Sequence, residues 1–446
     1  MTKENISDLA KIKKVFFIGI GGIGVSAIAR MMLEAGKRVA GSDIGESEIT
    51  SELVKLGAEI KKGQGVELIP DDADLIVYSI AIEKYDPDFF SKLKKLGKAL
   101  KSYPEMLGIL TKDKYTVAVS GTHGKTTTTA MIAKILIDTG VDPSVIVGSL
   151  LKEYKTNLIT GFSDVFVVEA CEYERSFLNL KPQILVITNI EVDHLDYYKD
   201  IADIESAFRE MAGQTADYIV CNPKDLATSH ILVHKYEAKI VDYTKYLEKV
   251  PPLSVPGEHN RMNAAAALAV ADILKVPEAE AEGPIAEFSG TWRRLEKKGQ
   301  TKEGAIIYDD YAHHPTEIKA SLQALRELYP VGTKKITILF QPHLYSRTKA
   351  LFDAFAKSFK EADQVLLLPI YFAREAKDES VSSEKLANAI CAEFLKGGKE
   401  VFVQAFPDFT GAERAVLDLS LGSNDVFVTM GAGEAYKVAD KVLKIE

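Results

Sequence analysis

The feature that most limits the fold of this chain is a repeated alternation of short apolar segments with longer stretches of helical pattern. Segments such as "KVFFIGI", "YTVAVS" and "KITILFQP" have the length and residue types of buried strands. Stretches such as "GVSAIARMMLEAG" and "TEIKASLQALREL" follow them with helical spacing of apolar residues. Strands that alternate with helices predict an α/β fold with largely parallel sheets.

The chain is too long, at 446 residues, for one ordinary core. We predict three α/β domains, at residues 1–112, 113–300 and 301–446. The segment "KSYPEMLGILTKDK" is expected to close the first domain, and a loop around "EGPIAEFSGTWRRLEKKGQTKEG" is expected to separate the second from the third. The pattern also predicts a helix that starts at Asn263 and one helix over "SRTKALFDAFAKSF".

Composition indicates a globular protein of a reducing compartment. Hydrophobic residues make up 46% of the chain and the formal net charge is -9, which argues against general affinity for nucleic acid. Cys171, Cys221 and Cys391 are odd in number and far apart, so neither a disulfide framework nor a zinc site is indicated. We therefore expect a cytoplasmic protein with no membrane or nucleic-acid partner; composition leaves the oligomeric state open.

A glycine-rich loop lies near the N-terminus, directly after the first predicted strand. Gly19, Gly21 and Gly24 form a G-x-G-x-x-G pattern, which lets backbone N–H groups approach a diphosphate at a helix N-terminus. Asp43 ends the next predicted strand, where an acid could bind a ribose. Taken alone, this predicts a dinucleotide site; the alternative is a glycine-rich turn that only packs a helix against a strand.

A second phosphate-binding pattern is "VSGTHGKTTTT". Gly121, Gly124, Lys125 and Thr126 match the end of a phosphate-binding loop, although Val119 stands where the full pattern has glycine. In such a loop the lysine neutralises phosphate charge and the adjacent hydroxyl reaches Mg²⁺. The later threonines of the run are interpreted as ordinary residues of the helix.

Acidic residues follow two neighbouring predicted strands. Glu169 and Glu172 end "VFVVEACE", and "TNIEVDHLDYY" supplies Asp193 and His194 with further acids. Because the carboxyl ends of parallel strands meet at one edge of a sheet, these groups could hold a metal beside the phosphate site predicted at Lys125.

Three later motifs carry polar side chains at predicted strand or helix ends. Asn260 and Asn263 either contact a nucleotide or cap the following helix. Arg293 and Arg294 suit phosphate or carboxylate, or form a solvated turn. The loops "YDDYAHHPTEI" and "QPHLYSRT", together with the loop of His194, bring four of the eight histidines towards one expected crevice. This concentration favours a site over scattered surface residues, and the four are His194, His313, His314 and His343.

Taken in order, these motifs resemble the Mur ligase family of peptidoglycan synthesis. The resemblance covers essentially the whole chain and rests on "GIGGIGVSAIA", "GSD", "GTHGKTTTT", "EACE", "TNIEVDHLDYY", "HNRMNAAAA", "RRLE", "DDYAHHPTE", "FQPHLYSRT" and "TMGAGE". It implies an N-terminal Rossmann-like domain that holds a UDP-sugar, a central P-loop ATPase-type domain, and a C-terminal Rossmann-like domain that closes the active site.

The resemblance also implies roles for individual residues. Lys125, His314 and Arg347 would take part in catalysis, and Thr126, Glu169 and His194 would hold Mg²⁺ or Mn²⁺. The ATP site would contain Gly121, Thr122, His123, Gly124, Lys125, Thr126, Thr127, Asn263 and Arg294. The UDP-sugar site would contain Gly19, Gly21, Gly22, Gly24, Ser42 and Asp43.

The implied reaction is the ATP-dependent ligation of L-alanine to the lactyl carboxylate of UDP-N-acetylmuramate through an acyl phosphate. Ala312 stands where such ligases commonly have glycine. Alanine at this position resembles the related recycling ligase, which attaches a whole murein tripeptide to the same UDP-sugar. That reaction is the alternative. An NAD-dependent oxidoreductase and a regulatory ATP-binding module are two further hypotheses, of which the first leaves "GTHGKTTTT" without a purpose.

Overall fold

The computed structural model describes residues 9–373 and 375–444. Contacts between residues divide the chain into two compact units. The first unit comprises Met1–Ile190, Glu205–Tyr246 and Ala266–Pro284. The second unit comprises Glu191–Ile204, Leu247–Ala265 and Ile285–Glu446.

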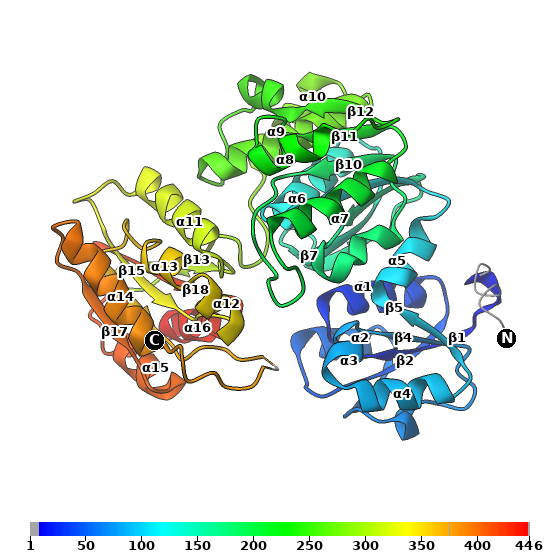
Figure 1. Cartoon of the computed structure of the whole chain (residues 1–446), viewed down its shortest axis with the longest axis horizontal. Helices are drawn as coiled ribbons and strands as arrows, with labels where there is room; N and C mark the ends of the chain where they lie inside the picture. Colours follow the sequence, from blue (N-terminus) through cyan, green and yellow to red (C-terminus); the bar gives the residue numbers. More distant parts are fainter. Residues whose placement is uncertain (1–8, 374, 445–446) are drawn as a thin grey trace. The chain divides into compact units, whose positions relative to one another are not determined.

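A five-stranded parallel sheet is formed by the N-terminal part of the chain (Figure 1). Its strands, in spatial order, are β3 (Glu59–Lys62), β2 (Arg38–Asp43), β1 (Lys14–Ile18), β4 (Leu75–Tyr78) and β5 (Ala99–Ser102). Its helices are α1 (Ile23–Glu34), α2 (Glu48–Lys55), α3 (Ala81–Tyr85), α4 (Pro87–Lys95) and α5 (Tyr103–Thr111). Alternate strand residues pack on opposite faces, so that Phe17 joins a core with α1 whereas Phe16 joins one with α4.

A seven-stranded sheet follows, in which the β7–β8 pair alone is antiparallel among the described strands. In spatial order the strands are β12 (Lys239–Asp242), β11 (Tyr218–Cys221), β10 (Ile184–Ile187), β6 (Tyr115–Ser120), β9 (Val165–Glu169), β7 (Ser144–Leu151) and β8 (Thr156–Ile159). The associated helices are α6 (Lys125–Asp138), α7 (Ile201–Gly213), α8 (Leu226–Leu232), α9 (Glu258–Ile273) and α10 (Glu278–Glu287). The central position of β6 explains why five of its six residues are buried.

The third sheet has six strands and belongs to the second unit. In spatial order these are β13 (Glu296–Gln300), β14 (Ile306–Asp310), β18 (Asp425–Met430), β15 (Lys335–Phe340), β16 (Gln364–Leu367) and β17 (Phe402–Ala405), with only β13 antiparallel among the described strands. Its helices are α11 (Pro315–Leu328), α12 (Tyr345–Ala350), α13 (Phe352–Ala356), α14 (Ser383–Lys396), α15 (Phe409–Leu417) and α16 (Tyr436–Lys444). Helices α11, α13 and α14 share a core on one face, and α15 and α16 share a core on the other.

These three sheets confirm the predicted α/β fold with largely parallel strands, and they correct several local predictions. The expected single helix over "SRTKALFDAFAKSF" is divided into α12 and α13, because Leu351 departs from helical geometry (φ -109°, ψ 21°). The segment expected to close the first domain contains α5, whose start is stabilised by a capping box between Ser102 and Glu105. Within the expected interdomain loop, residues 296–300 form the edge strand β13.

The domain boundaries stay a prediction. A boundary at residue 300 would separate β13 from β14, although the two strands pair with each other. The first eight residues of the predicted first domain, and residues 374, 445 and 446 of the third, lie outside the described residues.

Within the first unit, the N-terminal sheet and the central sheet contact each other through helix α1 and strand β8. The side-chain amide of Asn157, which is 1% exposed, donates hydrogen bonds to the carbonyl of Ile23 and to the hydroxyl of Ser26. Ile23 begins α1, so this contact fixes the start of the helix that follows the first glycine loop. In the described part of the chain, no helix is long and apolar enough to cross a membrane.

Gly24 is expected to be intolerant of any side chain, because the ring of Tyr103 lies directly against it. A Cβ at Gly24 would lie 2.6–2.9 Å from three ring atoms of Tyr103. We therefore expect Gly24→Ala to lower the midpoint of thermal unfolding by several degrees, the scale of an overpacked core. Differential scanning fluorimetry measures this change.

Gly283→Ala is the matched control, because Gly283 lies in α10 and a Cβ there would meet no atom of another segment within 4 Å. Alanine there should be neutral or stabilising. Gly24→Ala should lower the midpoint of thermal unfolding much less in a Tyr103→Ala variant than in the unaltered chain. An equal cost in both backgrounds would show that Tyr103 is not the cause.

Candidate active site

The first glycine loop lies between β1 and α1 in the first unit. The amides of Gly19 and Ile20 both donate to the carbonyl of Ser42, at 2.9 and 3.2 Å. The amide of Gly21 donates to a carboxylate oxygen of Asp43 at 2.8 Å. Asp43 was predicted to bind ligand, and here its carboxylate holds the loop itself, so that β2 determines the conformation of the loop.

The second glycine loop lies between β6 and α6 and depends on two left-handed glycines. Gly121 has a φ of +134°, and a Cβ there would lie 2.0 Å from the hydroxyl of Thr188. Gly124 has a φ of +84° and precedes α6 as its N-cap residue. The amides of Lys125, Thr126 and Thr127 begin the helix without an intrahelical acceptor, which is the arrangement that binds phosphate.

Asn189 holds the other side of this loop, and its role was not predicted from the sequence. The amides of Thr122 and His123 donate to the backbone carbonyl and the side-chain oxygen of Asn189, both at 3.0 Å. Its side-chain nitrogen donates to the carbonyl of His123 at 2.9 Å. Asn189 follows the strand β10, so the "TN" of "ITNIEVDH" was the available signal.

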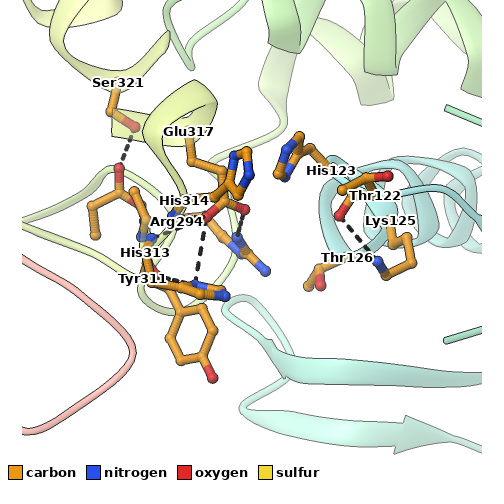
Figure 2. Close-up of polar contacts among 12 residues, drawn as sticks. Thr122, His123, Lys125, Thr126, Arg294, Tyr311, His313, His314, Glu317 and Ser321 are labelled. Carbon is orange, nitrogen blue, oxygen red and sulfur yellow. Dashed lines mark hydrogen bonds and ion pairs between the residues drawn. The ribbon is translucent and has the colours of Figure 1, made fainter. Parts of the chain in front are cut away.

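Lys125 lies largely buried and points back into the loop, where its ammonium donates to the carbonyl of Thr122 at 3.1 Å (Figure 2). The same ammonium lies 2.9 Å from a carboxylate oxygen of Glu172, which is 2% exposed. Burial alone would lower the pKa of Lys125, but the negative charge of Glu172 outweighs it and raises the pKa above its usual value. Lys125 therefore keeps its positive charge throughout the neutral range.

Two of the three predicted metal ligands lie together at the start of α6. The hydroxyl of Thr126 donates to a carboxylate oxygen of Glu169 at 3.1 Å, and the other oxygen accepts from the amide of Gly148 at 2.8 Å. A Cβ at Gly148 would lie 2.6 Å from Glu169, so glycine leaves the space that this carboxylate occupies. Hard oxygens beside a phosphate-binding helix fit a Mg²⁺ ion. The third predicted ligand, His194, belongs to the second unit.

In the second unit, Asp193 lies at the centre of a group of positively charged and histidine side chains. Its carboxylate accepts two hydrogen bonds from the guanidinium of Arg347, both at 3.1 Å, and one from the amide of His194 at 2.7 Å. Burial would raise the pKa of Asp193, but the neighbouring His194 and the guanidinium of Arg347 outweigh it and hold the pKa below its usual range. Asp193 is therefore ionised at neutral pH.

Two of the four histidines that were predicted to share a crevice lie close together within this unit. The ring centroid of His313 lies 6.0 Å from that of His343, and His343 accepts a hydrogen bond from Arg347 at 3.4 Å. Burial lowers the pKa of His313 to about 3 and that of His343 to about 4, and Arg347 contributes in both cases. Both rings are neutral at pH 7.

His314, predicted to take part in catalysis, has both ring nitrogens engaged. Its Nε2 contacts the carbonyl of Val192 at 3.2 Å, and its Nδ1 accepts from the amide of Thr316 at 3.3 Å, so Nε2 carries the proton. The ring is the N-cap of α11 and is 5% exposed. To accept a proton, His314 must first release Thr316.

A pocket of about 110 Å³ adjoins the Asp193–Arg347 pair. Its lining combines charged side chains with apolar ones and consists of Asp193, His194, Leu195, Asp196, Leu344, Ser346, Arg347, Ala350 and Leu351. A cationic guanidinium at the edge of a partly apolar pocket suits a small molecule that carries a carboxylate.

The predicted nucleotide-contacting residues of the second unit lie on two elements. Asn260 and Asn263 are 7% and 6% exposed and lie within the first two turns of α9, which begins at Glu258, so the alternative that they cap the helix is wrong. Arg294 lies near Glu317, with 3.5 Å between its Nη1 and a carboxylate oxygen (Figure 2). The neighbouring Arg293 is fully engaged with protein groups and does not form the solvated turn that was the alternative.

Three successive parts of the chain match domains of one protein family. Residues 14–115 match the Mur ligase family, catalytic domain; residues 119–250 match the Mur ligase middle domain; and residues 293–433 match the Mur ligase, glutamate ligase domain. A UDP-N-acetylmuramate--L-alanine ligase of Clostridium kluyveri is 40% identical, with 98% of this chain and 99% of that protein aligned. The enzyme of the same name from Caldanaerobacter subterraneus is also 40% identical, with 98% of each chain aligned.

Solved structures show the same architecture. The crystal structure of the UDP-N-acetylmuramate-alanine ligase MurC from Thermotoga maritima superposes with a TM-score of 0.77 at 28% identity, over 97% of this chain and 98% of that one. A murein peptide ligase from Psychrobacter arcticus superposes with a TM-score of 0.71 at 22% identity, over 97% and 98% of the two chains, which is a likeness of fold.

The pH dependence of stability is expected to report on His259, which lies near the start of α9. Burial lowers the pKa of His259 to about 4, with a further contribution from Arg294. The unfolded chain has a pKa of about 6.5 there and binds more protons between these two values, so stability falls as the pH decreases from about 6.5 towards 4. The midpoint of thermal unfolding should fall less between pH 7 and pH 5 in His259→Gln than in the unaltered chain.

His234→Gln is the control for this measurement, because His234 is exposed. Its pH profile should follow that of the unaltered chain. If His259→Gln follows it too, the proposed cost of protonating His259 in the folded state is wrong.

Proposed function

We propose that this chain, which belongs to the Mur ligase family, joins L-alanine to the lactyl carboxylate of UDP-N-acetylmuramate and converts ATP to ADP and phosphate. The product is UDP-N-acetylmuramoyl-L-alanine, made in the cytoplasm as a peptidoglycan precursor. The observation that carries this proposal is the 40% identity to the Clostridium kluyveri L-alanine ligase over nearly the full length of both chains. The domains are proposed at 1–112, 113–300 and 301–446.

The UDP-sugar is proposed to bind at the first glycine loop. Backbone amides at the start of α1 can donate hydrogen bonds to the diphosphate, so no charged side chain is required there. The site consists of Gly19, Gly21, Gly22, Gly24, Ser42 and Asp43. Because Asp43 accepts from the amide of Gly21, the carboxylate keeps the loop in one conformation before substrate binds.

ATP is proposed to bind at the second glycine loop. Lys125 and the amides at the start of α6 neutralise the β- and γ-phosphates. Thr122 and His123 lie in the loop between Gly121 and Gly124, and Thr127 lies in the first turn of α6. Asn263 contacts the adenine and Arg294 the phosphates. The site fits an anion because Lys125 keeps its positive charge throughout the neutral range. A bound phosphate would compete with the carboxylate of Glu172 for the ammonium of Lys125.

Mg²⁺ is proposed to be held by Thr126, Glu169 and His194. The ion would neutralise phosphate charge as the acyl phosphate forms. The pairing of Thr126 with Glu169, and the space left by Gly148, support the first two assignments.

The reaction needs activation because a carboxylate is a poor acceptor for an amine. Attack of the lactyl carboxylate on the γ-phosphorus forms an acyl phosphate, with ADP as the leaving group. The amine of L-alanine then adds to the carbonyl carbon, and the tetrahedral intermediate expels phosphate. Arg347 is proposed to bind the carboxylate of alanine at the pocket described above, with Asp193 displaced from part of the guanidinium.

His314 is proposed to receive the proton that the amine loses. The lone pair on its Nδ1 becomes available when Thr316 moves, because Nε2 already carries a proton. His313 and His343, whose pKa values are lowered to about 3 and about 4, are weaker bases than an ordinary histidine.

The test of this function is an omission series over ATP, UDP-N-acetylmuramate and L-alanine in the presence of Mg²⁺, read as phosphate and ADP release. We expect release to require all three substrates and the product to gain the mass of one alanyl residue. Murein tripeptide is the rival acceptor. Turnover with the tripeptide alone would replace the proposed reaction by the recycling reaction, and phosphate release indifferent to the sugar would leave only a nucleotide-binding module.

Replacement of Lys125 tests the nucleotide site separately. Lys125→Met removes the charge that faces the phosphates, so we expect kcat/KM for ATP to fall roughly 100- to 1,000-fold. Lys134→Met is the control, because Lys134 lies on the same helix and pairs with Asp138 and Glu153 instead. Comparable losses in both variants, or a Lys125 variant that retains its activity, would contradict the assignment.

A further inference from the structure

Arg293 is buried at the carboxyl ends of the third sheet, between α10 and β13 in the sequence, with 4% of its surface exposed. Its Nε donates to Asp309 at 2.7 Å, its Nη2 donates to the carbonyl of Gly431 at 2.7 Å, and its Nη1 donates to the carbonyl of Gly433 at 3.3 Å. All three guanidinium nitrogens therefore bind protein oxygens.

The flat faces of this guanidinium are also in contact with protein. Its central carbon lies 4.6 Å from the ring centroid of Tyr436, 5.3 Å from that of Tyr311 and 5.8 Å from that of Trp292. Asp309, the acidic partner, accepts a further hydrogen bond from the hydroxyl of Thr429 at 2.6 Å. This environment satisfies the charge of Arg293 completely and leaves it no role in binding substrate.

The backbone on both sides of Arg294 is held in a left-handed conformation. Arg293 has a φ of +57° and Leu295 has a φ of +44°, which is unfavourable for residues with a side chain. Two backbone contacts fix Arg293 there: its amide donates to Glu296 at 3.0 Å, and its carbonyl accepts from the amide of Tyr311 at 2.6 Å. Such strain persists only where surrounding contacts determine the conformation.

Arg294 extends from this segment towards Glu317 and shares one neighbour, Tyr311, with Arg293. It lies 3.5 Å from a carboxylate oxygen of Glu317, and its guanidinium carbon lies 5.2 Å from the ring centroid of Tyr311 (Figure 2). Its side chain is partly exposed, whereas that of Arg293 is 5% exposed. The two adjacent arginines therefore differ in kind: one is bound entirely by the protein, and the other is accessible to a ligand.

We propose that Arg293 is a positioning residue that holds the strained segment 293–295 against the third sheet and so fixes the direction of the Arg294 side chain. A buried ion pair alone is weak evidence for stability, because apolar residues can often replace it. An apolar residue cannot, however, bind the carboxylate of Asp309 and the carbonyls of Gly431 and Gly433 at fixed angles. This inference rests on the proposed function in one respect, namely that Arg294 contacts ATP.

Arg326 provides a matched control in the same unit. It also binds one aspartate, Asp363 at 2.6 Å, and carbonyls of the chain, among them that of Glu361 at 2.8 Å, and its side chain is 9% exposed. Arg326 lies in the last turn of α11, and its hydrogen bonds to described residues all go to partners outside segment 293–295. Arg326→Met therefore removes a similar buried arginine without releasing segment 293–295.

The experiment compares Arg293→Met, Arg293→Lys, Arg294→Ala, the double variant Arg293→Met/Arg294→Ala and Arg326→Met by steady-state kinetics. We expect Arg293→Met to raise the KM for ATP roughly 10- to 100-fold, as Arg294→Ala does, because a small displacement of a binding group is costly. The double variant should be no worse than Arg294→Ala alone, since Arg293 acts through Arg294. Arg326→Met should keep the KM for ATP of the unaltered enzyme.

Fluorescence gives a second readout that does not depend on ATP. The chain has one tryptophan, and Trp292 lies directly before Arg293, with its ring centroid 6.2 Å from that of Tyr436. Quenching of Trp292 by acrylamide should increase in Arg293→Met and stay unchanged in Arg326→Met. Arg293→Lys, which keeps the charge but not the fork of donors, should also increase it; this variant carries the test if Arg293→Met does not fold.

Three results would overturn the inference, and they have different meanings. If the effects of Arg293→Met and Arg294→Ala on KM multiply in the double variant, Arg293 does not act through Arg294. If Trp292 is quenched equally in all the variants, Arg293 does not hold the segment. If Arg294→Ala itself leaves the KM for ATP unchanged while the omission series still gives the alanyl product, the ligase function stands but Arg294 has no ATP role for Arg293 to support.

Discussion

The backbone amides at the start of α6 are the feature on which the proposed chemistry depends most, and left-handed glycines make them available. Gly121 and Gly124 turn the chain from β6 into the helix in a conformation that other residues rarely adopt. The turn places Lys125 and Thr126 in the first helical positions, within reach of Glu172 and Glu169 at the end of the neighbouring strand β9. The parallel pairing of β6 with β9 thus joins the second glycine loop to its acidic residues.

Much of this could be predicted from the sequence, because the signals were local. Strand patterns identified β1, β6 and β15, and glycine spacing located both loops. The break between α12 and α13 could not be read from helical periodicity, because apolar spacing continues across Leu351. The start of α9 was placed too late, because the polar residues of "EHNRMN" carry no apolar signal although they form its first turns.

The different roles of neighbouring residues of one type also could not be predicted from the sequence. Arg293 and Arg294 are identical in type, and only the three-dimensional environment shows that the first is enclosed by Asp309 and aromatic rings. The same holds for Glu169 and Glu172, of which the second is buried beside Lys125. Tyr103 acts through a contact with a segment distant in sequence, so no spacing rule could indicate it, and for Asn189 the available signal was its place directly after a predicted strand.

Three buried ion pairs have different consequences because their cations differ in their access to a ligand. Arg293 binds Asp309 and two carbonyls and is in contact with three aromatic rings, so moving it would leave several buried acceptors unsatisfied. Lys125 pairs with Glu172 and also binds two backbone carbonyls, but it lies beside the first amides of α6, and Arg347 pairs with Asp193 at the edge of a pocket. Exchange of one carboxylate for another anion conserves the pairing of the cation, which avoids the cost of an uncompensated buried charge during binding. By this criterion Lys125 and Arg347 suit substrate binding, whereas Arg293 suits a permanent structural position.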